Sequence, residues 1–205
     1  MIKQILGSIK HKLIGHRYRI VDSALGGIPL KVYQGTIRQV PDIDDAWFAS
    51  LAKEAKIIFD IAANIRYSAL LANVYGKPEN MVLVDPNPLA LASAADNLIL
   101  NNLSDNCRFV AAFVSDTDKD KVKFYTVGRG AAASVYPEHA KTASSANSWF
   151  WVPTVTLDEL SLRFGLEPDL IKVDVEDAEG MVLNRAKAIC KNNAWGMESL
   201  DYVAT

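Results

Sequence analysis

The sequence has few cysteines and histidines, the residues that form disulfides and bind zinc. It contains only two cysteines, Cys107 and Cys190, which lie far apart. Disulfide-stabilised secreted domains carry many more cysteines, so this composition favours a reducing, cytoplasmic compartment. The three histidines, His11, His16 and His139, show no metal-ligand spacing. The sequence therefore predicts no zinc site.

Long apolar runs and an excess of one charge are also missing. No run approaches the roughly 20 apolar residues of a membrane-spanning helix. The basic segment 1–19 lacks the continuous apolar region of a secretory signal. The 22 Lys and Arg residues nearly balance the 24 Asp and Glu residues, which argues against a nucleic-acid partner. Half of the 205 residues are hydrophobic, enough for the core of one domain.

Short apolar runs alternate with helical patterns, which is typical of a parallel sheet covered by helices on both faces. Residues 1–55 are expected to form an extension made of a helix, a hairpin and a second helix over 42–55, capped by Asp42 or Asp44. The core, 56–205, is expected to complete a single domain. Its predicted strands are 56–61, 81–85, 107–114, 121–127, 150–155, 170–175 and 195–200, and its predicted helices are 66–76, 88–101, 156–164 and 178–191. The long stretch 128–148 lacks a period and indicates a lid or a disordered loop.

Acidic residues end several of the predicted strands. Asp60 lies in the first apolar run of the core, Asp85 ends the second, and Asp174 ends a later one. Ligands of such sheets bind beyond the carboxyl ends of the strands, so we expect these carboxylates to converge. A nicotinamide-dependent oxidoreductase would need Gly-x-Gly-x-x-Gly after the first strand, and that motif is absent here.

Together, several stretches give this sequence a family resemblance. From about residue 55 to 190, they follow one another in the order and at the approximate spacing of a known protein family. The stretches are 59–65 (FDIAANI), 84–88 (VDPNP), 97–102, 111–116 (AAFVSD), 152–160 and 168–176 (PDLIKVDVE). With them, the chain resembles the FkbM-type methyltransferases, which use S-adenosylmethionine. The resemblance implies an α/β fold, the Rossmann-like class I methyltransferase three-layer sandwich with a mostly parallel sheet.

The resemblance also implies a function and a set of site residues. The reaction would be transfer of a methyl group from S-adenosylmethionine to a hydroxyl of a small acceptor such as a sugar or natural product. The turn over 60–66 would hold the methionine end of the cofactor, Asp85 its ribose, and Ala111 and Ala112 would border its adenine. The implied cofactor-binding residues are Asp60, Ala62, Asn64, Arg66, Asp85, Ala111 and Ala112, and the implied catalytic residues are Lys172, Asp174 and Glu176.

The chain departs from the family pattern at three glycine positions, which hold Ala62, Arg66 and Asp177. Glycine permits close backbone approach and unusual dihedral angles. The departures keep a second reading open, in which the chain is a catalytically silent relative that serves as a binding or scaffold module. Its C-terminus is also short for the class. The sheet edge there could be left open, covered by the early hairpin, or covered by a second copy of the chain in a homodimer.

Each of three further features could have a functional role or a purely structural one. The acidic segment 174–179 could bind a divalent metal or simply begin a solvated helix. Trp149 and Trp151 are expected to anchor the core or the loop rather than form a sugar-stacking platform. His139 could act as a base on a lid, but the plain interpretation is a surface histidine.

Overall fold

A five-stranded parallel sheet forms the centre of the computed structural model, which describes residues 19–38, 40, 42–63, 67–116, 121–128, 133–175, 179–184 and 197–199. In this described part the strand order is β10-β9-β3-β4-β5, and all neighbours pair in parallel. The strands are β3 (Ile57–Ile61), β4 (Asn80–Val84), β5 (Cys107–Val110), β9 (Leu170–Val173) and β10 (Met197–Ser199). Each matches a predicted strand, because short apolar runs are what strands buried on both faces require.

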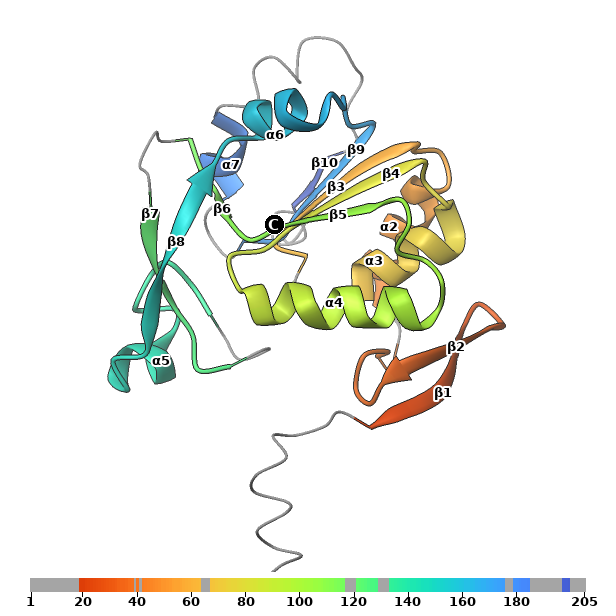
Figure 1. The fold of residues 1–205 in the computed structure, drawn as a ribbon, viewed down its shortest axis with the longest axis horizontal. Coiled ribbons are helices and arrows are strands. Elements are labelled where there is room, and N and C mark those ends of the chain that lie inside the picture. The colour runs from red at the N-terminus through yellow and green to blue at the C-terminus, as the bar shows by residue number, and fades with distance from the viewer. Residues whose placement is uncertain are drawn as a thin grey trace, which may run out of the picture.

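Helices cover both faces of this sheet (Figure 1). One face carries α2 (Ile43–Ala52), α3 (Tyr67–Leu71), the π-helical turn η1 (Ala72–Gly76) and α4 (Pro88–Leu100). The other carries α6 (Leu157–Phe164) and α7 (Glu179–Asn184). Alternate residues of β3 face opposite cores, so that Ile58 packs with the first group and Phe59 with the second. The predicted three-layer α/β architecture is therefore confirmed, and none of the described helices has the length and apolar character needed to cross a bilayer.

The predicted helix over 66–76 is not one regular helix. It passes from α3 into the π-helical turn η1, which ends when the Lys77 N–H bonds the Ala72 carbonyl at 3.0 Å. A Cβ at Gly76 would lie 2.1 Å from the Ala52 carbonyl oxygen. The wide turn thus brings a glycine against α2, a contact that no larger residue would permit.

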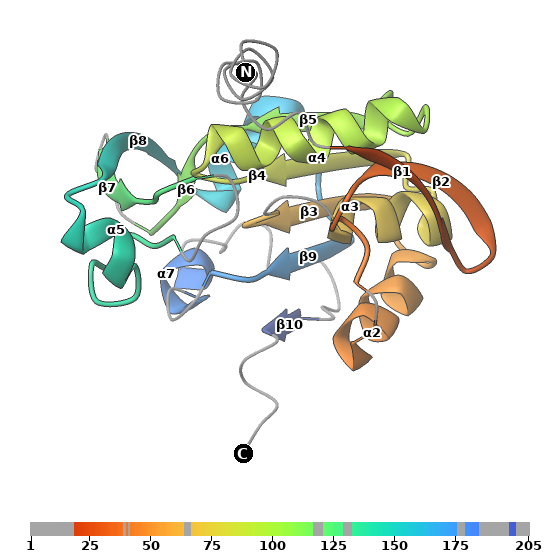
Figure 2. The ribbon, with the colours of Figure 1, turned by 90° about the horizontal axis from the view of Figure 1, so that it is seen from below.

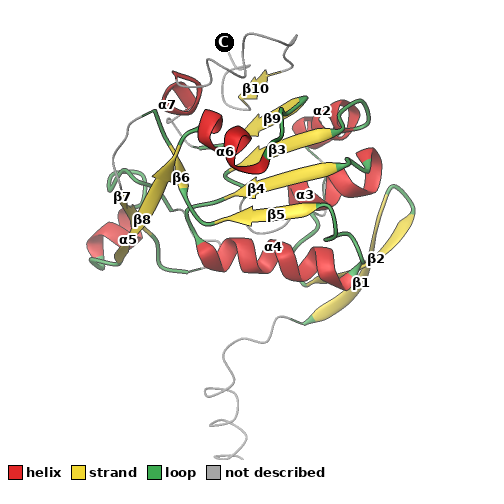
Figure 3. Ribbon diagram, turned by 45° about the horizontal axis from the view of Figure 1, so that its top comes forward, coloured by secondary structure: helices red, strands yellow, loops and turns green. Residues whose placement is uncertain are grey.

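A second, smaller sheet stands beyond the carboxyl ends of the main strands (Figures 1 and 3). In the described chain its order is β6-β8-β7, with β6 (Phe113–Val114), β7 (Lys121–Tyr125) and β8 (Trp149–Val155). The predicted single strand over 107–114 is wrong, because the chain bends at Ala111 and Ala112 and β6 leaves the main sheet to pair with β8.

The stretch 128–148 contains more structure than its composition indicated. Ser134 forms a bridge with Tyr125, and α5 (Lys141–Ser145) follows. Ala140 and Ala143 are buried, so small residues provide packing here without a clear apolar period. The expectation of a disordered loop is wrong for residues 133–148, and the expectation of a lid stays a prediction.

The hairpin of β1 (Ile20–Leu25) and β2 (Ile28–Tyr33) docks on α4 through two asparagines. Asn101 Oδ1 accepts from the Lys31 N–H at 2.9 Å, and its amide donates to the Lys31 carbonyl at 2.8 Å. The buried Asn97 accepts from the Tyr33 N–H at 2.9 Å. These side chains replace a neighbouring strand along β2. The hairpin lies against α4, so it does not cover the edge at β10, and that alternative is wrong.

The two asparagines should contribute unequally to stability, since Asn97 is fully buried and the Asn101 contacts are exposed. We expect Asn97→Ala to lower the free energy of unfolding by about 1–3 kcal/mol, because buried backbone and hydroxyl groups lose their partner. Asn101→Ala should cost less, because water can replace its contacts. Urea denaturation of both variants tests this, and equal losses would show that burial does not set the difference.

Candidate functional site

The carboxyl ends of β3, β4 and β9 point the same way, toward the smaller sheet (Figure 2). This arrangement brings together Asp60, Asp85 and Asp174, which the sequence predicted to converge. Strand register places Asp60 directly beside Lys172 on β9 and beside Leu83 on β4. The candidate site is built on this edge of the main sheet.

Asp60 is completely buried and is held by a hydroxyl and an ammonium group. Its Oδ2 accepts a hydrogen bond from Ser68 Oγ at 2.6 Å. Its Oδ1 lies 3.6 Å from Lys172 Nζ, an ion pair slightly too long for a hydrogen bond. Among the described groups, Oδ1 has no hydrogen-bond partner. Asp60 is therefore an internal charge beneath the site edge, while direct contact with a ligand stays a prediction.

Lys172 connects this buried carboxylate to a more exposed one. Its Nζ donates to Asp174 Oδ2 at 3.3 Å. The Lys172 side chain is 11% exposed, and that of Asp174 is 44% exposed. The three residues form a line from the core to the surface, which we call the Asp60–Lys172–Asp174 line. The contact joins two of the residues that the family resemblance implied as catalytic, Lys172 and Asp174, and their roles stay a prediction.

Burial and ion pairing act in opposite directions on the charges of this line. Burial raises the pKa of Asp60 above its ordinary value, against the effects of the Lys172 ammonium and the Ser68 hydroxyl. Burial alone would lower the pKa of Lys172, but the carboxylates of Asp60 and Asp174 outweigh it and raise that pKa. Lys172 therefore stays charged at neutral pH and holds a cation at the site edge.

The turn after β3 holds Ala62 in a backbone conformation that favours glycine. Ala62 has φ of 58°, in the left-handed region. A residue with a Cβ pays a steric cost there that glycine does not pay. The turn after β3 is thus strained at Ala62.

Asp85 follows β4 and begins a tight turn into α4. It is buried, and its Oδ1 accepts from the Asn87 N–H at 2.7 Å. Asn87 Oδ1 in turn caps α4 by accepting from the Leu89 N–H at 3.0 Å. Sequence reasoning assigned no role to Asn87 or to Ser68. The Asn-Pro pair at 87–88 is a helix-start signal that could have identified Asn87, whereas Ser68 carries no local signal.

The structure describes only some of the remaining predicted site residues. Ala112 is buried at the bend between β5 and β6, and Ala111 is exposed beside it. Asn64, Arg66 and Glu176 lie outside the described residues. Within the described residues, no three His, Cys, Asp or Glu side chains are arranged to hold a metal ion. His139 is exposed and lies edge-on to Tyr136.

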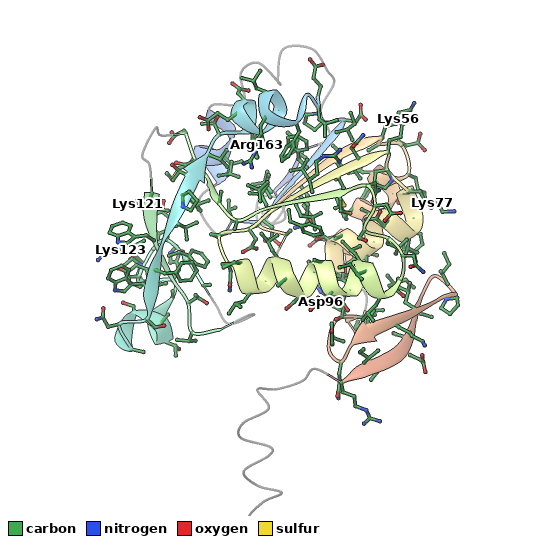
Figure 4. The ribbon with its side chains drawn as sticks, viewed as in Figure 1. Lys56, Lys77, Asp96, Lys121, Lys123 and Arg163 are labelled. Carbon is green, nitrogen blue, oxygen red and sulfur yellow. The ribbon has the colours of Figure 1, made fainter. Side chains whose placement is uncertain are left out.

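On the outer face of the β7–β8 ribbon, Lys121 and Lys123 (Figure 4) lie over the rings of Trp151 and Trp149. Trp151 is 50% exposed and does not anchor the core, and its expected role as an anchor of the loop stays a prediction. Lys123 Nζ lies 4.1 Å from the centre of the Trp149 ring, and Lys121 Nζ lies 5.2 Å from that of Trp151. Such cross-strand cation–π contacts stabilise a ribbon without any ligand.

Substitutions of Asp60 and Lys172 should have strongly coupled effects on the free energy of unfolding, because the two side chains form an ion pair. Lys172→Met leaves a buried carboxylate without a counter-charge, and we expect a loss of about 3–5 kcal/mol in unfolding free energy at pH 7. The loss should shrink as the pH falls, because protonation of Asp60 removes its charge. Asp60→Asn with Lys172→Met should recover much of the stability. Additive losses in this double-mutant cycle, measured by denaturation, would show that the two groups do not interact.

Strain at Ala62 gives a second expectation. Ala62→Gly should raise the unfolding free energy by about 0.5–1 kcal/mol, since relief of the left-handed strain exceeds the added entropy of the unfolded chain. Thermal and urea unfolding measure the change. A clear destabilisation would mean that the Ala62 methyl group contributes packing that exceeds its strain.

Comparison with known proteins identifies the family to which the chain is similar. The Methyltransferase FkbM domain family matches residues 60–200. Among solved structures, M. jannaschii TYW2 in complex with AdoMet is 19% identical, with 53% of this chain and 49% of that chain covered at a TM-score of 0.37. P. horikoshii TYW2 in complex with MeSAdo is 18% identical, with 51% and 46% covered at 0.35.

The SAM-dependent methyltransferase from Agrobacterium tumefaciens is 14% identical, with 76% of this chain and 39% of that chain covered at a TM-score of 0.41. The chain spans about half the length of the two TYW2 structures. No curated protein matches it. The family match includes more than half of the residues and both Asp60 and Asp174. The chain therefore belongs to the FkbM methyltransferase family.

Proposed function

We propose that the chain transfers a methyl group from S-adenosylmethionine to a hydroxyl of a small acceptor such as a sugar or natural product. The observation that carries this proposal is the Asp60–Lys172–Asp174 line. It places a partly exposed carboxylate, paired with a buried lysine, at the sheet edge where Asp85 also lies. Family membership supports the methyl donor, and the chemistry of the edge supports an acceptor that must lose a proton.

The residues of this edge fit the cofactor. Ala62 keeps the left-handed turn that allows close backbone approach, although with one added methyl. Asp85 presents a carboxyl group at the end of β4, where it would accept hydrogen bonds from the ribose hydroxyls. Ala112 would border the adenine. Bound S-adenosylmethionine supplies an electrophilic methyl group on a sulfonium.

The protein's own contribution would be alignment and proton transfer. Methyl transfer is an in-line displacement, so holding the acceptor oxygen in line supplies much of the rate. Asp174, 44% exposed, would accept the proton of the acceptor hydroxyl. Lys172 would orient this carboxylate through the 3.3 Å hydrogen bond. Glu176 is proposed as a second carboxylate near the methyl group.

The second candidate is a silent relative that binds a ligand without turnover. Ala62 favours it, because its Cβ adds a methyl group at a left-handed position where the family pattern has glycine. Arg66, at another glycine position, adds a long side chain to the same turn. A protein that binds the cofactor but methylates none of a panel of hydroxylated acceptors would fit this candidate.

Cofactor binding at Asp85 can be tested directly. In calorimetry with S-adenosylhomocysteine, Asp85→Ala should weaken affinity by about 1–3 kcal/mol, the scale of hydrogen bonds to a charged group. Asp96→Ala is the matched control, since it removes the same charge from the exposed surface of α4 (Figure 4). Unchanged affinity in Asp85→Ala would remove this carboxylate from the site. NAD should not bind to either protein.

A further inference from the structure

Asn87 makes contacts that exceed the needs of a helix cap. It is 4% exposed. Its N–H is held by Asp85 Oδ1 at 2.7 Å, and its Oδ1 caps α4. Its remaining polar group, Nδ2, donates to the Gly128 carbonyl at 2.8 Å. Serine or aspartate would cap a helix equally well, but neither carries an amide N–H beside its capping oxygen.

The Gly128 carbonyl belongs to a small hydrogen-bonded unit at one end of the β7–β8 ribbon. Thr126 Oγ1 donates to this carbonyl at 2.9 Å. The Thr126 N–H donates to the Ser148 carbonyl at 3.2 Å, and Ser148 Oγ donates to the Thr126 carbonyl at 2.7 Å. The end of β7 is thereby fixed to the start of β8. Whatever holds Gly128 also holds this end of the ribbon.

The ribbon is attached to the main layer at its two ends. At one end, β6 continues from β5 and pairs with β8. At the other, Asn87 reaches Gly128 from the turn that follows β4. On the side of α7, the Tyr136 hydroxyl donates to Met181 Sδ at 3.4 Å. The Asn87 contact differs from the others because it begins two residues from Asp85.

The side-chain amide of Asn87 makes both contacts, the helix cap on α4 and the hydrogen bond to Gly128. Oδ1 and Nδ2 lie in one plane, so a rotation that releases Gly128 also withdraws the cap from α4. The Asp85 carboxylate fixes the backbone of Asn87 through its N–H. A ligand that orders the Asp85 carboxylate thus also orders the Asn87 side chain, which binds the Gly128 carbonyl of the ribbon.

We propose that Asn87 is a positioning residue that couples occupation of the Asp85 site to the placement of the β7–β8 ribbon. The inference rests on the proposed function, because it takes the adenosine part of the cofactor as the occupant. Through this contact, the cofactor would stabilise the smaller sheet over the acceptor side before the acceptor enters. The reciprocal effect follows from linkage: loss of the contact weakens cofactor binding.

Hydrogen exchange on the full chain tests the proposal with and without S-adenosylhomocysteine. Without ligand, Asn87→Ser should speed exchange of the amides in 121–128 about 3- to 10-fold, the loss expected for one hydrogen bond. The amides at the start of α4 should be unchanged, because serine keeps the cap. Ligand should slow exchange in 121–128 in the parent chain and have no effect there in Asn87→Ser.

Two controls separate the possible causes. Asn87→Asp keeps the cap but sets an oxygen against the Gly128 carbonyl, so it should exceed Asn87→Ser in its effect on 121–128. Tyr136→Phe removes the contact on the α7 side and should leave the ligand effect on 121–128 intact.

Each outcome decides a different part of the proposal. Unchanged exchange of 121–128 in ligand-free Asn87→Ser, or equal fraying of α4, would overturn the role of Asn87 as the anchor. Ligand protection that survives in Asn87→Ser would overturn the coupling alone. If calorimetry shows no binding to the parent chain, the proposed function and the coupling both fail, and the ligand-free comparison still decides the anchor.

Discussion

The buried ion pair between Asp60 and Lys172 sets the constraint on which the candidate site depends. Two charges removed from water are tolerated only if they remain paired and well held. The pair joins the adjacent strands β3 and β9 in the middle of the main sheet, with Ser68 supplying a further hydrogen bond from α3. Lys172 extends the arrangement to Asp174, just beyond the end of β9. Lys172 therefore links the buried carboxylate of Asp60 to an oriented carboxylate at the edge of the sheet.

Both sheets contribute residues around this edge. The main sheet supplies Asp85 and the strained turn at Ala62, and the smaller sheet stands beyond the same carboxyl ends. The bend at Ala112 lets one stretch of chain serve both sheets. Asn87 gives the smaller sheet a second attachment, close to Asp85. The main sheet packs against two large buried clusters, whereas the smaller sheet is held by a small cluster around Phe113, Phe124 and Val152 and by a few polar contacts. Ligand-dependent ordering is therefore expected in the smaller sheet.

Local patterns in the sequence were enough to predict the strands of the main sheet, the capped helix α6 and the carboxylates at the sheet edge. Buried parallel strands leave apolar runs, and Thr156 with Glu159 forms the expected capping box. The partner of Asp60 could not be derived in this way, because it depends on β9 lying beside β3 and the two strands are distant in sequence. The break after Val110, the packing of Ala143 and the exposure of Trp151 were also missed, since each depends on a second sheet that no local period reveals.

The central claim is that Asp85, the turn after β3 and the Asp60–Lys172–Asp174 line form one cofactor and acceptor site. A crystal structure of the protein with S-adenosylhomocysteine tests it most directly. The account predicts ribose hydroxyls within about 2.6–3.2 Å of the Asp85 carboxylate, with the sulfur facing Asp174. A ligand bound elsewhere, or bound with its ribose away from Asp85 and its sulfur away from Asp174, would contradict the account.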